Sequence, residues 1–334
     1  MVLTVYLSAV VPRLIFVLHT VLAVWRVTLV KNDPIYWLLL LSILLTLVEM
    51  VVTLTIQKGK DYSGFSPALF FYLINIIPPV WMLELYQLDK RIHSEECRSM
   101  NSSMKCTHFV QSTEAPTIRL RNSSSTINVV IDFLNSTLDW TLGFHQTLMI
   151  LLIVGKWILP MGAGVRRDQL SQLLLTFVGI AADILEFKSE TLSEKGVRCH
   201  PELVYAILAL WTWSMLQFPL DLTVLQKTEE SHPHEDKPTK NVHKHSADLW
   251  NITISIFIQD GPFFIFRLFL MFHKGIVHQM LLFFTIKNAL VLTLQIYRLA
   301  LIYLEMRQSN GRQQLTPPED NVPTCNTEMG DIAE

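Results

Sequence analysis

The chain has 334 residues, half of them hydrophobic and only 17% charged. This composition excludes an intrinsically disordered chain and is unusual for a water-soluble protein. The formal net charge of −2 gives no reason to expect a nucleic-acid partner, and we expect none.

Eight apolar runs approach the length of about 20 residues that a helix needs to cross a bilayer. They lie at 14–30, 36–56, 65–88, 142–159, 170–187, 203–225, 252–272 and 277–304. The sequence therefore predicts an all-α, polytopic membrane helix bundle of eight transmembrane helices within residues 1–307, with the lipid bilayer as its surroundings. The first run lacks the basic segment of a signal peptide, so we expect it to be retained.

Pro78 and Pro79 interrupt the third run beyond its middle, and the seventh run also contains a proline. Interruptions at corresponding positions of two halves are typical of transporters whose binding site lies between repeats. No side-chain similarity relates the two halves of this sequence, however.

Residues 89–138, between the third and fourth runs, are polar and contain three N-x-S/T sequons, at Asn101, Asn122 and Asn135. Sequons mark N-glycosylation in a loop that faces the lumen or the cell exterior. With eight spans, this orientation places both termini in the cytosol. Eleven Lys and Arg residues then lie on the inner side and five in the short outer loops, the direction that the positive-inside rule requires, although residues 89–138 hold six more.

Three cysteines, Cys97, Cys106 and Cys199, fall on the outer side, where disulfides persist. A bond between Cys97 and Cys106 would close a short loop. A bond from either of them to Cys199 would join two outer loops. The sequence does not choose among these pairings, and it also leaves open that no pair forms.

The fifth run, 170–187, is the weak point of this topology because it contains Asp183 and Glu186. We predict that it spans the membrane. If it were interfacial or re-entrant instead, the C-terminus would lie outside and a further sequon at Asn251 would be exposed. Residues 226–248 are predicted to form a polar cytosolic loop, and residues 308–334 a disordered cytosolic tail.

The seventh run contains an acid beside a helix breaker, Asp260 before Gly261 and Pro262, and the eighth run contains Lys287. An ionisable group in hydrocarbon costs about 2.5–3.5 kcal/mol on insertion scales, so such groups pair or line a polar cavity. With Lys274 as the tip of the last hairpin, Asp260 and Lys287 both lie about 20 Å from the outer turn. The sequence therefore predicts a buried ion pair between them.

Pro262 also lacks the backbone N–H that a helix would use at this position, and its ring clashes with the carbonyl group of Ile258. That oxygen then needs another partner. We therefore expect a kinked or broken seventh helix with Gln259 and Asp260 at the break.

Other ionisable residues within the runs are matched by depth. Arg267 lies about 8–10 Å below the outer surface by helical rise, and Glu84 and Asp183 at a similar depth are its expected partners. Glu49 lies about 10 Å from the cytosolic edge. Two cations near that edge, Lys156 and Arg298, are expected to extend to the headgroups. Either of them could instead pair with Glu49. These matches favour an internally paired bundle over a wide aqueous pore.

The polar loop 226–248 contains four histidines among carboxylates, but their spacing matches no closed zinc site. We expect a solvated loop and no bound metal. The sequence contains no H-E-x-x-H, G-x-S-x-G, P-loop or kinase motif. We therefore expect neither enzymatic activity nor a cofactor.

Four long strings of the membrane portion resemble the transmembrane protein 26 family. They are FSPALFFYLINIIPPVWMLEL (65–85), RRDQLSQLLLTFVGIAADILEF (166–187), VYAILALWTWSMLQFPLDL (204–222) and SADLWNITISIFIQDGPFF (246–264). The string VPRLIFVLHTVLAVWRV at 11–27 is similar to the first helix of that family. The resemblance implies a multi-pass membrane protein and carries over no catalytic or binding residue.

Two functions fit this sequence. The first is a non-enzymatic protein of the plasma membrane or of secretory-pathway membranes that acts through protein partners, which the glycosylated loop and the paired charges favour. The second is a secondary carrier of a small polar solute, which the interruption at 259–262 favours. Direct contact between Asp260 and Lys287 in a dry bundle would count against the carrier.

Overall fold

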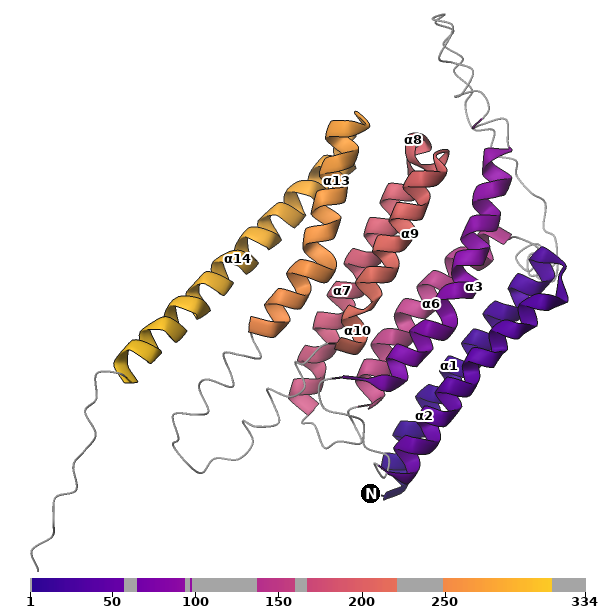
Figure 1. Ribbon diagram of the computed structural model, residues 1–334, viewed down its shortest axis with the longest axis horizontal. Helices are drawn as coiled ribbons and strands as arrows, with labels where there is room; N and C mark the ends of the chain where they lie inside the picture. Colours follow the sequence, from indigo (N-terminus) through magenta and orange to yellow (C-terminus); the bar gives the residue numbers. More distant parts are fainter. Residues whose placement is uncertain are drawn as a thin grey trace, which may run out of the picture.

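The computed structural model describes residues 2–56, 65–93, 97, 137–159, 167–220 and 249–313. These residues are almost entirely helical, and no strand occurs among them. The long helices lie side by side and lean in the same sense, as helices that cross one bilayer do (Figure 1). The predicted all-helical membrane fold is confirmed at this level.

The helices follow the apolar runs closely at some ends and extend beyond them at others. The first half of the chain contains α1 (Val2–Lys31), the 3-10 helix η1 (Pro34–Ser42), α2 (Ile43–Thr55), α3 (Pro67–Ile92) and α6 (Thr137–Ile158). The middle contains α7 (Arg167–Ser193), α8 (Lys195–Arg198), α9 (Pro201–Met215) and α10 (Gln217–Leu220). The last part contains helical residues 249–255, the π-helix η4 (Ile256–Asp260), α13 (Gly261–His273) and α14 (Gln279–Gln313).

Seven helical stretches of the described chain are long and apolar enough to cross a membrane. They are Tyr6–Lys31, Pro34–Thr55, Pro67–Ile92, Trp140–Ile158, Pro201–Leu220, Leu249–His273 and Gln279–Arg307. The predicted fifth run lies in α7, which is not one of the seven. At about 1.5 Å per residue, the 27 residues of α7 would nevertheless extend about 40 Å.

One apolar core joins most of the helices. Phe16 of α1, Leu69 of α3, Leu152 of α6, Ile184 of α7 and Trp211 of α9 are all buried in it. In contrast, α2 and α14 bury the smallest parts of their apolar windows, 22% and 17%, and turn large apolar side chains outward. These two helices therefore form the periphery of the bundle.

Gly155 lies where α6 packs closely against α1 and α3. A Cβ atom at this position would lie 2.8 Å from Phe16 Cζ and 2.9 Å from Leu69 Cδ2. Because glycine has no Cβ atom, α6 packs directly against side chains of α1 and α3. Gly143, earlier in the same helix, has nothing within 4 Å of the corresponding position.

Pro78 and Pro79 lie within the uninterrupted helix α3. A membrane helix tolerates proline where neighbouring helices pack around it and the freed carbonyl groups find other partners. Ile76 and Val80 on either side are fully buried in the core, so packing holds the helix together through both prolines. The break predicted here is therefore wrong, and the proposed correspondence with the seventh run is lost.

Candidate functional site

The seventh run contains a π-helical turn at η4, Ile256–Asp260. Its closing hydrogen bond runs from the N–H of Gly261 to the carbonyl oxygen of Ile256. A Cβ atom on Gly261 would lie 2.5 Å from that same oxygen, so glycine is the residue that this turn accommodates. π-Helical turns within α-helices occur frequently at functional sites.

Because Pro262 has no backbone N–H, one carbonyl group of the preceding turn lacks its hydrogen-bond donor. The π-helical register changes which carbonyl group this is. In an i to i−5 pattern, the missing N–H of Pro262 would have served Phe257 and not Ile258. The indole Nε1 of Trp213, on α9, donates to the Phe257 oxygen at 3.3 Å. A side chain of a neighbouring helix thus replaces the lost backbone donor.

Asp260, the last residue of η4, is held by two neutral side chains. Its Oδ2 accepts hydrogen bonds from Ser255 Oγ at 3.0 Å and from Gln295 Nε2 at 2.6 Å. The same Gln295 nitrogen donates to Ser255 Oγ at 3.0 Å, which closes a triangle of three polar atoms. Asp260 is only 7% exposed, and it forms no ion pair within the described chain.

The predicted ion pair between Asp260 and Lys287 is wrong. Lys287 Nζ lies 2.6 Å from Asp183 Oδ1 and 3.6 Å from Glu186 Oε1, and both acids belong to α7. Lys287 therefore connects α14 to α7, and Asp260 is left with neutral partners.

The position of the last hairpin explains this difference. α13 ends at His273, but α14 begins only at Gln279, so the turn is centred several residues after Lys274. Asp260 lies thirteen residues before the end of α13, whereas Lys287 lies eight residues after the start of α14. At 1.5 Å per residue, the two levels differ by about 7–8 Å.

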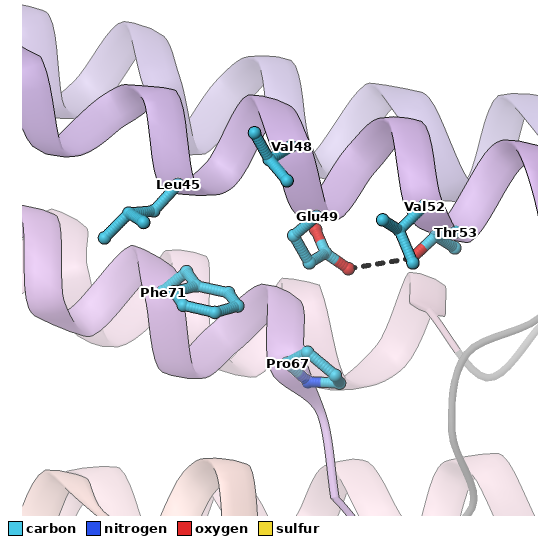
Figure 2. A pocket seen from close by; sticks show the side chains of 7 residues that line it. All are labelled: Leu45, Val48, Glu49, Val52, Thr53, Pro67 and Phe71. Atoms are coloured by element: carbon cyan, nitrogen blue, oxygen red, sulfur yellow. Dashed lines mark hydrogen bonds between the residues drawn. The ribbon is translucent and has the colours of Figure 1, made fainter.

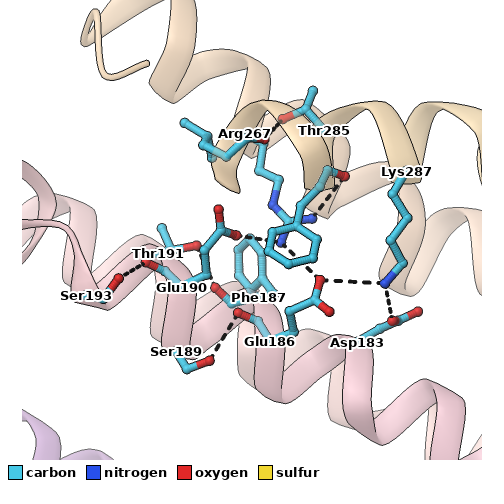
Figure 3. A network of polar contacts seen from close by, with 12 residues as sticks. Asp183, Glu186, Phe187, Ser189, Glu190, Thr191, Ser193, Arg267, Thr285 and Lys287 are labelled. Atoms are coloured by element: carbon cyan, nitrogen blue, oxygen red, sulfur yellow. Dashed lines mark hydrogen bonds and ion pairs between the residues drawn. The ribbon is translucent and has the colours of Figure 1, made fainter. Parts of the chain in front are cut away.

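Arg267 lies at the centre of a polar network between α13 and α7 (Figure 3). Its Nη2 atom is 2.9 Å from Glu190 Oε2 and 4.0 Å from Glu186 Oε1. The guanidinium group also lies over the rings of Phe187 and Phe284, at 5.5 and 5.2 Å from their centroids. Carboxylates and aromatic faces together stabilise this buried cation.

Glu84 and Asp183, the predicted partners of Arg267, belong to other pairs. The fifth apolar run ends at residue 187, so the sequence placed Glu190 in an outer loop and not among the partners of Arg267. α7 instead continues to Ser193 and carries Glu190 to the level of Arg267.

Glu84 of α3 contacts side chains of two other helices, α6 and α7. Its Oε1 atom accepts a short hydrogen bond from Lys188 of α7 and lies 3.0 Å from His145 Nε2 of α6. The His145 ring packs edge-on against Trp211 at 4.7 Å between centroids. The sequence offered no signal for Lys188, because it follows the end of the apolar run.

Glu49 of α2 pairs with Arg13 of α1. Arg13 Nε and Nη2 donate to the two carboxylate oxygens at 2.8 and 2.6 Å, and Nη1 donates to the carbonyl oxygen of Ala9 at 2.7 Å. The alternative pairing of Glu49 with Lys156 or Arg298 is wrong: Lys156 is buried over the Phe177 ring, and Arg298 is exposed. α1 begins at Val2, so it carries Arg13 into the bundle instead of leaving it at the membrane edge.

A shallow groove of about 270 Å³ lies beside this pair, between α2 and α3 (Figure 2). Its walls are mostly apolar and include Val48, Pro67 and Phe71. Thr53 Oγ1 donates to Glu49 Oε1 at 2.9 Å, so the one carboxylate in the wall has hydrogen-bond partners. The groove therefore presents a predominantly apolar surface.

A disulfide bond joins Cys97 to Cys199, with 5.5 Å between their Cα atoms. Of the pairings that the sequence left open, this one connects the outer end of α3 to the segment before α9. Cys106, the sequons Asn101, Asn122 and Asn135, the loop 226–248 and the tail from 314 lie outside the described residues.

The family model described as Transmembrane protein 26 matches residues 3–298, which include the first six described spans and most of the seventh. No solved structure matches the chain.

Proposed function

The chain belongs to the transmembrane protein 26 family, and from this premise we propose that it is a non-enzymatic membrane protein that acts through protein partners. It is an integral membrane protein with several apolar helices. We further propose eight spans with both termini in the cytosol, in the plasma membrane or in a membrane of the secretory pathway.

The eight-span topology rests on the surroundings of α7. This helix lies among the long helices of the bundle (Figure 1) and directs Asp183, Lys188 and Glu190 to partners on α14, α3 and α13. A helix lying flat in the headgroup region would instead leave its charges to water. Ion pairs with three neighbouring helices support an α7 that crosses the membrane.

The partner-binding function rests on one observation, the mutual pairing of buried charges. Four bases inside the bundle each meet a carboxylate on another helix: Arg13, Lys188, Arg267 and Lys287. Such pairs fix which helices lie side by side, and none of these four bases is left to line a solute path. The arrangement suits a rigid membrane scaffold.

The test compares the size of the protein in two settings. In native membranes dissolved in mild detergent, we expect the chain in an assembly larger than the purified chain in the same detergent. Purified chain in vesicles should take up no member of a panel of small polar solutes above the level of empty vesicles. Migration at the size of the purified chain, or uptake that Asp260→Asn abolishes, would contradict the proposal.

A carrier of a small polar solute is the second candidate, and a specific observation favours it. The sequence argued against transport on the ground that Lys287 neutralises Asp260. That neutralisation is missing, because Lys287 contacts Asp183 and Glu186. Asp260, at a π-helical turn inside a span, therefore remains the candidate binding residue.

A further inference from the structure

Asp260 is the carboxylate of this region that has no base within ion-pair distance among the described residues. The three carboxylates of α7 each lie within 4.0 Å of one of two bases: Asp183, Glu186 and Glu190 with Arg267 and Lys287. Lys188, on the same helix, pairs with Glu84. Asp260 adds a further carboxylate that is 7% exposed. Arg298, one turn beyond Gln295, is exposed and forms no ion pair with Asp260 in the described structure.

A buried carboxylate held only by neutral groups is strongly unfavourable in a low-dielectric environment. Ser255 and Gln295 donate hydrogen bonds to Asp260 but supply no charge. Asp260 is thus held by neutral donors alone, and a single positive charge bound beside it would compensate this carboxylate.

The Ser255 hydroxyl contacts this carboxylate, and the side-chain amides of Gln295 and Gln259 each have an oxygen atom without a partner among the described residues. Gln295 Oε1 is buried without a partner among the described residues, and its amide nitrogen is 2.6 Å from Asp260. Rotation of the Gln295 amide by half a turn exchanges its oxygen and nitrogen, so that its oxygen, the Ser255 hydroxyl and the carboxylate converge. The neighbouring Gln259 is 3% exposed, and its Oε1 atom also has no partner within the described chain.

We propose that Asp260, Ser255 and Gln295 bind a small monovalent metal cation such as Na⁺. The ligands are hard oxygen atoms, which Na⁺ prefers, and they lie at an irregular turn of a span. Ser255 and Gln295 are half-buried, whereas the carboxylate between them is buried. The site rests on the carrier function for its physiological role, as the place where a coupling ion binds.

Equilibrium binding of radioactive ²²Na⁺ to the purified full-length chain in lipid nanodiscs tests this site. We expect saturable binding of about one ion per chain, displaced by unlabelled Na⁺ and lost in Asp260→Asn. Ser255→Ala and Gln295→Leu keep the carboxylate and should each weaken binding about tenfold, as expected for the loss of one polar contact. Asp89→Asn, an exposed acid at the outer end of α3, is the control and should bind like the parent.

The outcomes separate the site from the carrier function. Absence of saturable Na⁺ binding in the parent, or equal binding in all three site variants, overturns the proposal. If Asp260→Asn does not fold, the binding measured for Ser255→Ala and Gln295→Leu tests the proposal. Na⁺ binding without solute uptake supports the cation site and contradicts the carrier function. Solute uptake without any Na⁺ binding supports the carrier function and contradicts the cation site.

Discussion

Arg13, Arg267 and Lys287 show how a basic side chain is held inside a membrane bundle. Each meets a carboxylate from another helix, and Arg13 engages both oxygens of Glu49. For the buried pairs of Arg13 and Arg267, removing one member leaves the other without a partner, which costs about 3–5 kcal/mol in soluble proteins. The cost should be smaller for Lys287 and Asp183, whose side chains are 33% and 39% exposed. The choice of partner is therefore the property to test at this scale.

The partner of Lys287 can be identified by a double-mutant cycle. Lys287→Met and Asp183→Asn should each lower the free energy of unfolding, because each leaves a charge unpaired. Their combined effect should differ from the sum by about 0.5–3 kcal/mol, as for residues in contact. The measurement is unfolding of the purified chain in detergent micelles.

The control cycle joins Lys287→Met with Asp260→Asn. These two residues form no hydrogen bond or ion pair with each other, so their coupling should be smaller than that between Lys287 and Asp183. A larger coupling of Lys287 to Asp260 than to Asp183 would restore the ion pair that the sequence suggested.

Helix ends decide which residues lie inside the bundle. Hydropathy ends the fifth run at residue 187 because polar residues follow, yet α7 continues to Ser193. Lys188 and Glu190 thereby enter the bundle and meet partners on α3 and α13. The sequence of α7 alone does not predict this extension, because the charges that stabilise it belong to other helices.

Close packing at α6 provides a test at the scale of elements. Gly155→Ala should lower the free energy of unfolding by about 1–3 kcal/mol, because the new methyl group meets Phe16 and Leu69. Gly143→Ala is the matched control in the same helix and should be neutral or stabilising by up to about 1 kcal/mol. Equal effects of the two substitutions would show that α6 does not approach α1 and α3 this closely.

At the scale of the whole molecule, the Cys97–Cys199 bond ties the outer end of α3 to the segment before α9. The contact between Glu194 and His278, at 3.7 Å, brings the turn between α13 and α14 to the same end. This arrangement agrees with a lumenal or extracellular side that also carries the sequons. The direction of the chain across the membrane then depends on whether α7 spans.

Glycan mapping decides the topology. Replacing Asn101, Asn122 and Asn135 together with Gln should shift the chain to the electrophoretic mobility of its enzymatically deglycosylated form. With α7 inserted, Asn251 is cytosolic and carries no glycan. A glycan that remains in the triple variant and disappears on Asn251→Gln would mean that α7 does not cross the membrane.

The sequence by itself determined the membrane class, the family and the approximate position of most spans, because transfer into a bilayer depends on the composition of each segment. It also identified Gly261 and Pro262 as the place where a span becomes irregular. Only the tertiary structure decided which charges meet. A hairpin that turns a few residues later shifts neighbouring helices by about 7–8 Å, which is farther than an ion pair reaches. Lys287 thereby joins Asp183, and Asp260 is left for a ligand.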